Sequence, residues 1–69
     1  MKIDTKKLEL AMARKEIGVR ELAIMSGTSP GAISKYIRGL MNPSIKNIGK
    51  ISRAIGVDVT EIIEVEKKE

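Results

Sequence analysis

The chain has 69 residues, of which 42% are hydrophobic and one is aromatic, so it is long enough for one small domain with an aliphatic core but too short for a catalytic domain with a separate substrate cleft. It contains no cysteine and no histidine, which excludes zinc fingers, disulfide-bonded scaffolds and catalytic pairs of a nucleophile with an imidazole base. The net charge of +4 is uneven: residues 22–57 carry five basic and no acidic residues, which predicts a polyanionic partner or, alternatively, an ordinary solubilising surface.

The sequence has no segment that indicates a membrane or secreted protein. No apolar run approaches the roughly 20 residues that cross a bilayer, and the first residues lack the apolar stretch of a signal peptide. We therefore expect a single cytoplasmic domain over residues 1–69, with its packed part at about residues 4–65 and flexible ends at the first few residues and at 66–69. We expect no enzymatic activity, no cofactor and no bound metal ion.

The first predicted helix begins after an N-cap at Asp4 or Thr5 and continues to about Lys15. Its apolar residues lie three or four positions apart, as in a helix that packs on one face: Leu8, Ala11 and Met12. Gly18 then separates this helix from the next one.

A second predicted helix at residues 19–26 is joined to a third helix by a tight turn. Gly27 ends the second helix, because glycine readily adopts the left-handed conformation of a helix C-terminus. Ser29 is a strong N-cap and Pro30 fits the first helical position, so the third helix runs from Pro30 to a stop at Gly39. The residues expected to face the core are Leu22, Ala23, Ile33, Tyr36 and Ile37.

A fourth helix is predicted between a Ser44 N-cap and Gly56, and a fifth at residues 59–64, where Asp58 and Glu61 have the spacing of a capping box. The inner face of the fourth helix consists of Ile45, Ile48, Ile51 and Ile55. Its basic face consists of Lys46, Lys50 and Arg53. The expected fold class is therefore all-α, with five short helices.

Several short motifs occur in an order and spacing that are specific when taken together: Glu21-Leu22-Ala23, Gly27-Thr28-Ser29, Ile33-Ser34-Lys35, Arg38-Gly39, Asn42-Pro43-Ser44 and Ala54-Ile55-Gly56-Val57. Through them residues 8–63 resemble the Cro and phage-repressor family of helix-turn-helix proteins, also called the xenobiotic-response-element type. The resemblance implies a lambda-repressor-like domain whose third helix enters the major groove of double-stranded DNA, in a sequence-specific transcriptional regulator, most simply a repressor. A plain helical bundle is the alternative, but it leaves the acid-free residues 22–57 unexplained.

Two features of the helices depart from the family pattern. Val19 stands where relatives often have a glutamine that contacts a phosphate, so Arg20 is the expected substitute. Met12 and Ile37 stand where relatives often have an arginine and a glutamate that form an ion pair, and we expect both residues to be buried and in contact. Replacing an ion pair as a unit leaves no unpaired buried charge, so the double change is compatible with the same fold. The alternative is that the two residues occupy these positions by chance, since methionine and isoleucine are ordinary core residues of helices.

The start of the third helix departs from the family at the positions expected to reach base edges. These are Pro30 and Gly31, which lack hydrogen-bonding side chains, although Gly31 allows close backbone approach and Pro30 can touch a thymine methyl group. Base contacts are therefore assigned to Lys35, with Ser34 or Thr28 as helpers; the alternative for Lys35 is a phosphate contact only. The other residues expected at the DNA interface, of which all but Ser29 are assigned to phosphates, are Arg20, Ser29, Arg38, Ser44 and Lys46.

A module of this size covers one half-site, so a weak homodimer on a pseudo-palindromic operator is expected. The dimer contacts are assigned to apolar residues that are not needed to fill the core: Met41, Ile63 and Val65. Two other functions share the fold, namely an antitoxin that represses its own promoter while it holds a toxin, and a protein–protein adaptor that does not bind DNA. A neighbouring toxin gene would indicate the first, and the absence of salt-sensitive DNA retention would indicate the second.

Overall fold

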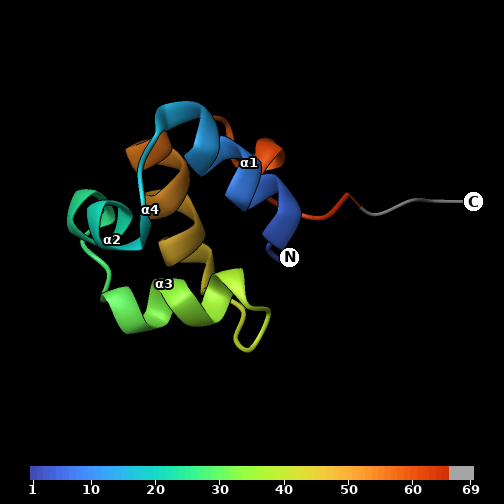
Figure 1. The fold of residues 1–69 in the computed structure, drawn as a ribbon. Coiled ribbons are helices and arrows are strands. Elements are labelled where there is room, and N and C mark those ends of the chain that lie inside the picture. The colour runs from blue at the N-terminus through green and yellow to red at the C-terminus, as the bar shows by residue number, and fades with distance from the viewer. Residues whose placement is uncertain (66–69) are drawn as a thin grey trace, which may run out of the picture.

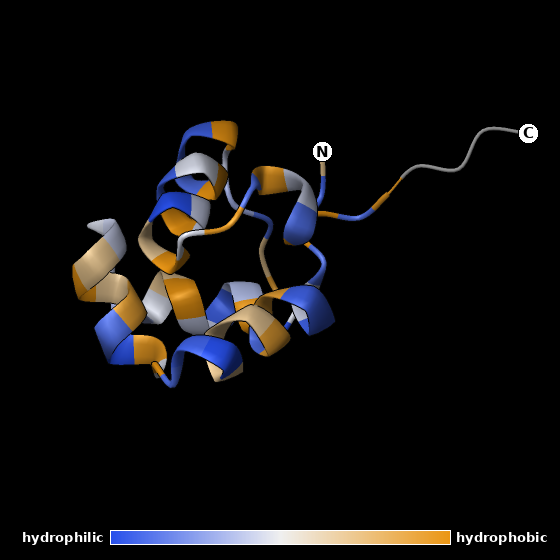
Figure 2. Ribbon diagram, turned by 90° about the horizontal axis from the view of Figure 1, so that it is seen from above, coloured by the Kyte–Doolittle hydropathy of each residue, from blue (hydrophilic) through white to orange (hydrophobic). Residues whose placement is uncertain are grey.

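The computed structural model describes residues 1–65 as four α-helices and one 3-10 turn around a single core (Figure 1). The elements in chain order are α1 (Thr5–Lys15), α2 (Val19–Ser26), α3 (Pro30–Ile37), α4 (Ile45–Ile55) and η1 (Val59–Glu61). The four α-helices correspond to the first four predicted helices, which confirms the all-α fold class. Figure 2 shows that each helix carries both hydrophobic and hydrophilic residues, as expected for helices that pack on one face. No helix within residues 1–65 is both long and apolar enough to cross a bilayer.

The starts of α1, α3 and α4 follow from side-chain caps, and the ends of α2 and α4 from glycine stops, as predicted from the sequence. Each cap accepts a hydrogen bond from the backbone N–H three residues later: Asp4 from Lys7 at 3.0 Å, Ser29 from Ala32 at 3.1 Å and Ser44 from Asn47 at 3.2 Å. Asp4, and not Thr5, is therefore the N-cap of α1. Gly27 and Gly56 end α2 and α4 in the left-handed conformation, with φ angles of 71° and 80°.

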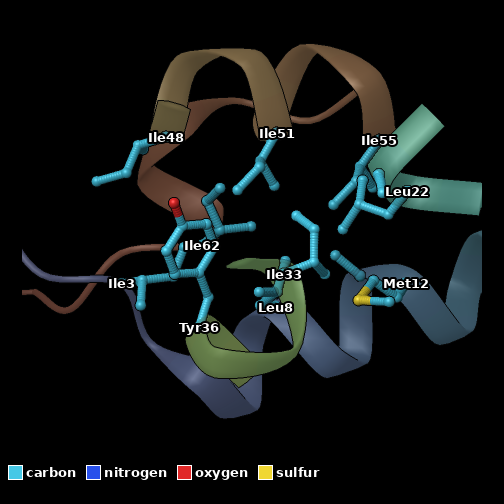
Figure 3. Packing of buried hydrophobic residues seen from close by; sticks show 12 residues of the cluster. Ile3, Leu8, Met12, Leu22, Ile33, Tyr36, Ile48, Ile51, Ile55 and Ile62 are labelled. Carbon is cyan, nitrogen blue, oxygen red and sulfur yellow. The ribbon is translucent and has the colours of Figure 1, made fainter. Parts of the chain in front are cut away.

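The core lies where the four α-helices meet, and its largest side chains point toward one another there (Figure 3). It is built from aliphatic residues, with Tyr36 as its one aromatic ring. The buried hydrophobic residues are Ile3, Leu8, Ala11, Met12, Leu22, Ala23, Ile33, Tyr36, Ile48, Ile51, Ile55 and Ile62. Burial of these side chains is the main stabilising contribution, since the sequence offers no cysteine for a disulfide.

Two isoleucines are less buried than the sequence pattern predicts. Ile45 is 75% exposed, so the prediction that it lies on the inner face of the fourth helix is wrong. It is the first residue of α4, beside the exposed residues Ser44 and Lys46, and helical periodicity does not say where the neighbouring elements end. Ile37 is half-buried against the core rather than fully buried, because it is the last residue of α3.

The prediction of a fifth helix at residues 59–64 is wrong, because the chain forms only the 3-10 turn η1 there. The Asp58 side chain accepts hydrogen bonds from the backbone N–H and the hydroxyl group of Thr60, and not from the N–H of Glu61 as the predicted capping box requires. These two bonds hold the pKa of Asp58 below its usual value, the hydroxyl bond having the larger effect.

The first residues of the chain pair with the segment that follows η1, so the prediction that they are flexible is wrong. Two backbone hydrogen bonds of 2.8 Å join the segments, from the N–H of Asp4 to the carbonyl of Ile62 and from the N–H of Glu64 to the carbonyl of Lys2. Between these bonds, Ile3 and Ile63 form an antiparallel bridge. The pairing occupies the N–H of Glu64, which a helix over residues 59–64 would direct to the carbonyl of Thr60. Residues 66–69, also predicted to be flexible, lie outside the described part of the chain.

Candidate nucleic-acid interface

The turn between α2 and α3 sets the crossing of the two helices and leaves α3 along one edge of the molecule (Figure 1). Gly27 is left-handed, and the N–H of Thr28 donates to the carbonyl of Ala23 at 2.9 Å, which closes the end of α2. Ala23 is buried, so a small side chain lies where the helices approach each other. This is the helix-turn-helix arrangement expected from the sequence, with one side of α3 exposed.

The surface of α3 opposite its core residues is polar and basic. Ile33 and Tyr36 are buried, whereas the residues on the other side of the helix reach solvent. The exposed residues of this face are Ser29, Pro30, Gly31, Lys35 and Arg38, with Ser34 half-buried beside them. Since neither the helix nor its caps contain an acidic residue, Lys35 and Arg38 give the face an uncompensated positive charge.

Gly31 lies in the first turn of α3, and no feature of the fold requires a glycine at this position. Its φ angle is not positive, and a Cβ atom added to it would have no neighbour within 4 Å. A glycine inside a helix is less favourable than an alanine by roughly 0.5 to 1 kcal/mol. The open space at Gly31 is therefore suited to the close approach of another molecule to the backbone.

In contrast to the α3 residues, Thr28 points its hydroxyl group inward. The Oγ1 atom is buried and has no hydrogen-bond partner among the described residues. In this side-chain conformation the hydroxyl group cannot donate to a base edge. The expected role of Thr28 as a helper in base contacts therefore has no support from the geometry.

The N-terminus of α4 supplies a second part of the site. Ser44 and Lys46 are exposed, and the first turn contains no acidic residue. Within residues 1–65 no group accepts a hydrogen bond from the backbone N–H of Ile45 or Lys46. Unpaired N–H groups at a helix start attract anions, and the ammonium group of Lys46 adds a full charge. The start of α4 is therefore suited to holding a phosphate.

The N-terminus of α2 is less favourable for an anion. Arg20 is exposed there, as expected for a phosphate contact. However, the Glu21 carboxylate accepts a hydrogen bond from the N–H of Gly18 at 2.8 Å and places a negative charge at the same helix end. Val19 adds no polar side chain. The unpaired N–H groups of Val19 and Arg20 and the charge of Arg20 can still attract a phosphate, but the nearby Glu21 carboxylate opposes it, so the start of α4 is the stronger anion site.

Comparison with known proteins agrees with this arrangement. Residues 10–62 match the family model described as Helix-turn-helix. The chain belongs to this family. This helix-turn-helix protein is 35% identical over 60 residues to the HTH-type transcriptional regulator SlrR of Bacillus subtilis (strain 168). The match covers 86% of the chain but only 40% of SlrR, so the chain spans less than half the length of that relative.

A solved structure also resembles this helix-turn-helix protein. It is the crystal structure of the restriction-modification controller protein C.AhdI from Aeromonas hydrophila, with a TM-score of 0.79 and 26% sequence identity. The similarity covers 83% of this chain and 86% of the C.AhdI chain. Together, the comparisons confirm the Cro and phage-repressor type of family that the motifs predicted.

One polar contact of the helix-turn-helix protein was not predicted from its sequence. Asn47 on α4 donates a hydrogen bond from Nδ2 to the hydroxyl oxygen of Tyr36 on α3, at 3.2 Å. Asn47 is half-buried and Tyr36 is buried. The sequence gives only a weak indication of this hydrogen bond, namely a polar residue at the third position of a helix that begins at a serine cap.

Proposed function

We propose that this helix-turn-helix transcriptional regulator binds a specific sequence of double-stranded DNA as a weak homodimer and represses transcription. In the proposed complex α3 lies in the major groove and the start of α4 contacts the flanking phosphates. Repression requires no more than occupation of a promoter, and such binding would take place in the cytoplasm.

The observation that carries this proposal is the common exposure of the α3 face and the α4 N-terminus, both basic and without an acidic residue. A surface of one charge beside an open helix N-terminus favours a polyanion whose phosphates lie at regular spacing. The matched proteins support the same function, since SlrR is named a transcriptional regulator and C.AhdI a controller protein.

Within this interface we assign base contacts to Lys35 and phosphate contacts to Arg38, Ser44 and Lys46. Lys35 is exposed on the outward face of α3, and an ammonium group there can reach guanine O6 and N7 in the major groove. Because few side chains of α3 can bond to bases, groove shape and deformability would supply part of the specificity.

Titration of labelled duplexes tests DNA binding. We expect the logarithm of the affinity to fall linearly and steeply with the logarithm of the salt concentration. The best duplex recovered from a random pool should bind at least about 10³-fold more tightly than a random duplex of the same length. The absence of salt-sensitive retention of any duplex would rule out the proposal and favour an adaptor, and equal retention of all duplexes would remove sequence specificity from it.

The surface proposed for the homodimer lies where the loop before α4 meets the paired terminal segments. Of the residues expected there, Met41 and Val65 are exposed and Ile63 is half-buried. Two surface hollows, one bordered by Met41 and the other by Ile63 and Val65, share Lys2 and Glu64 in their walls. The exposed apolar residues around them are Met1, Leu40, Met41 and Val65. A joint apolar surface of this kind supports contact between two copies of the chain.

The proposed dimer contact uses side chains and not the addition of a strand. The ammonium group of Lys7 donates to the carbonyl of Ile63 at 3.1 Å. On the other segment, the Asn42 side chain bonds to the backbone of Met1 and Ile3. These bonds occupy backbone groups that an added strand would need.

Sedimentation of the protein with a palindromic duplex tests the dimer. With half-sites about 10 base pairs apart, two copies should bind each duplex. Met41→Glu should reduce cooperative binding to the palindrome and leave binding to a single half-site unchanged. Ile24→Glu is the matched control, because Ile24 is 82% exposed on α2, outside the proposed surface. A strict one-to-one complex would exclude the dimer.

A further inference from the structure

We infer that the hydrogen bond between Tyr36 and Asn47 determines sequence specificity, because it holds the base-contacting face of α3 in register with the phosphate-contacting start of α4. The inference rests on the proposed function and adds two positioning residues to it. Neither residue needs to touch DNA, since each acts through the helix to which it belongs.

The bond joins two helices that carry different parts of the site. Tyr36 is 3% exposed, and its ring lies in the core with the hydroxyl group directed toward α4 (Figure 3). Asn47 is the third residue of α4, and its Nδ2 atom donates to the Tyr36 hydroxyl oxygen at 3.2 Å. Within residues 1–65 it is the only hydrogen bond between side chains of two different α-helices.

Each partner is directly linked to a residue of the proposed interface. The backbone N–H of Asn47 donates to the Ser44 hydroxyl oxygen at 3.2 Å, so Asn47 belongs to the cap at which a phosphate is expected. Tyr36 follows Lys35 in the chain and faces the core while Lys35 faces solvent. Any rotation or sliding of α3 that moves Lys35 therefore also moves the hydroxyl group that Asn47 holds.

Apart from this hydrogen bond, the packing contacts of α3 fix its position relative to α4 mainly through other helices. α3 packs mainly against α2 and α1. The segment between α3 and α4, residues 38–44, contains no helix or strand. Non-specific binding uses phosphate contacts alone and does not depend on the register of the two helices. Base recognition does depend on it, because Lys35 must meet one base edge while α4 is held on the backbone.

Tyr36→Phe tests the inference, because it removes the hydroxyl group and leaves the ring in the core. We expect affinity for the best duplex from a random pool to fall about three- to tenfold per half-site, the range that corresponds to one neutral hydrogen bond. Affinity for a random duplex should stay within about twofold, because phosphate contacts are unchanged. Asn47→Ala should give the same pattern, and both changes together should have no larger effect than either alone.

Ser52→Ala is the matched control for a purely structural effect. Ser52 is buried in α4, and its hydroxyl group donates to the carbonyl of Gly49 at 3.0 Å, so the change removes a comparable bond without affecting α3. It should lower the thermal midpoint and leave the ratio of specific to random affinity unchanged. In a Lys35→Ala background, Tyr36→Phe should no longer alter this ratio, because Tyr36 acts by positioning Lys35.

An equal loss of affinity for selected and random duplexes would overturn the inference, and so would an unchanged affinity for both. Additive effects of Tyr36→Phe and Lys35→Ala on the ratio would overturn it as well. If the unsubstituted protein showed no salt-sensitive binding to any duplex, the proposed function itself would fail, and the inference with it. The binding curve of the unsubstituted protein thus distinguishes the two failures.

Discussion

The side-chain oxygen of Asn42 accepts a hydrogen bond from the backbone N–H of Ile3 at 2.8 Å and so ties the loop after α3 to the first residues of the chain. The same side chain donates from Nδ2 to the carbonyl of Met1 at 3.0 Å. Ile3 is buried, so its N–H would have difficulty finding water in place of Asn42. The Asn42 side chain thus forms the two hydrogen bonds that a neighbouring β-strand would otherwise form with Met1 and Ile3.

Asn42→Ala should lower the free energy of unfolding by about 1 to 3 kcal/mol, because it leaves the Ile3 N–H without a partner. Urea denaturation with an unchanged m-value measures this loss. Asn42→Asp is the graded control, since it keeps an acceptor for Ile3 but cannot donate to Met1, and its effect should be intermediate. A loss below about 0.5 kcal/mol for Asn42→Ala would show that the contact contributes little to stability.

Gly31→Ala should stabilise the fold and weaken DNA binding. The added methyl group meets no neighbour within the protein and should raise the free energy of unfolding by about 0.5 to 1 kcal/mol. In the groove it should clash with DNA and reduce affinity for the selected duplex. Gly49→Ala is the matched control, because Gly49 is also helical and unobstructed but lies on α4, so only stability should rise. Unchanged binding by Gly31→Ala would mean that DNA does not approach this backbone.

Lys35→Ala and Lys46→Ala should differ in how they weaken DNA binding. Loss of a base contact at Lys35 should cost about 1 to 3 kcal/mol on the best duplex and relax the preference at one or two base pairs per half-site. Loss of a phosphate contact at Lys46 should weaken all duplexes about equally and lower the salt slope by about 1 per site. If Lys35→Ala weakened selected and random duplexes by the same factor, Lys35 would be a phosphate contact and specificity would come from DNA shape.

Met12 and Ile37 are predicted to contact each other, as the two members of a replaced ion pair. Met12 is 6% exposed and Ile37 is half-buried, so Met12→Arg should be the more damaging single change. Ile37→Glu alone should cost about 1 to 3 kcal/mol, because the carboxylate can still reach water at the end of α3. The double variant should recover part of the loss through a coupling energy of about 0.5 to 3 kcal/mol in a double-mutant cycle. A coupling of zero would argue against the alignment of these positions with the ion pair of relatives.

The sequence predicts those parts of the molecule that depend on residues close together in the chain. Ser29 and Ser44 mark helix starts because each cap bonds to an N–H only three residues away. The outward face of α3 is equally local, because helical periodicity places Lys35 opposite the core. The bridge between Ile3 and Ile63 was not predicted, because no residue near either one indicates a partner at the other end of the sequence.

Two features of the site were not predicted, because they too depend on more than the local sequence pattern. The bond from Asn47 to Tyr36 depends on how α3 and α4 pack, which the pattern of apolar residues does not specify. The inward hydroxyl group of Thr28 depends on a side-chain rotamer within the turn. The motifs therefore predicted the helices of the proposed interface but did not determine which of its polar groups face outward.

The antiparallel bridge at Ile3 and Ile63 closes nearly the whole described chain into a ring. Closure of a large ring restricts the unfolded chain more than closure of a short one, so this contact should form late in folding. In the native state the bridge should open by local fluctuation before the helices do. Because each segment is the other's backbone partner, fraying of one end should loosen the other. A protease that cuts near one end of the domain would then leave the other held by the side-chain bonds of Asn42 or Lys7.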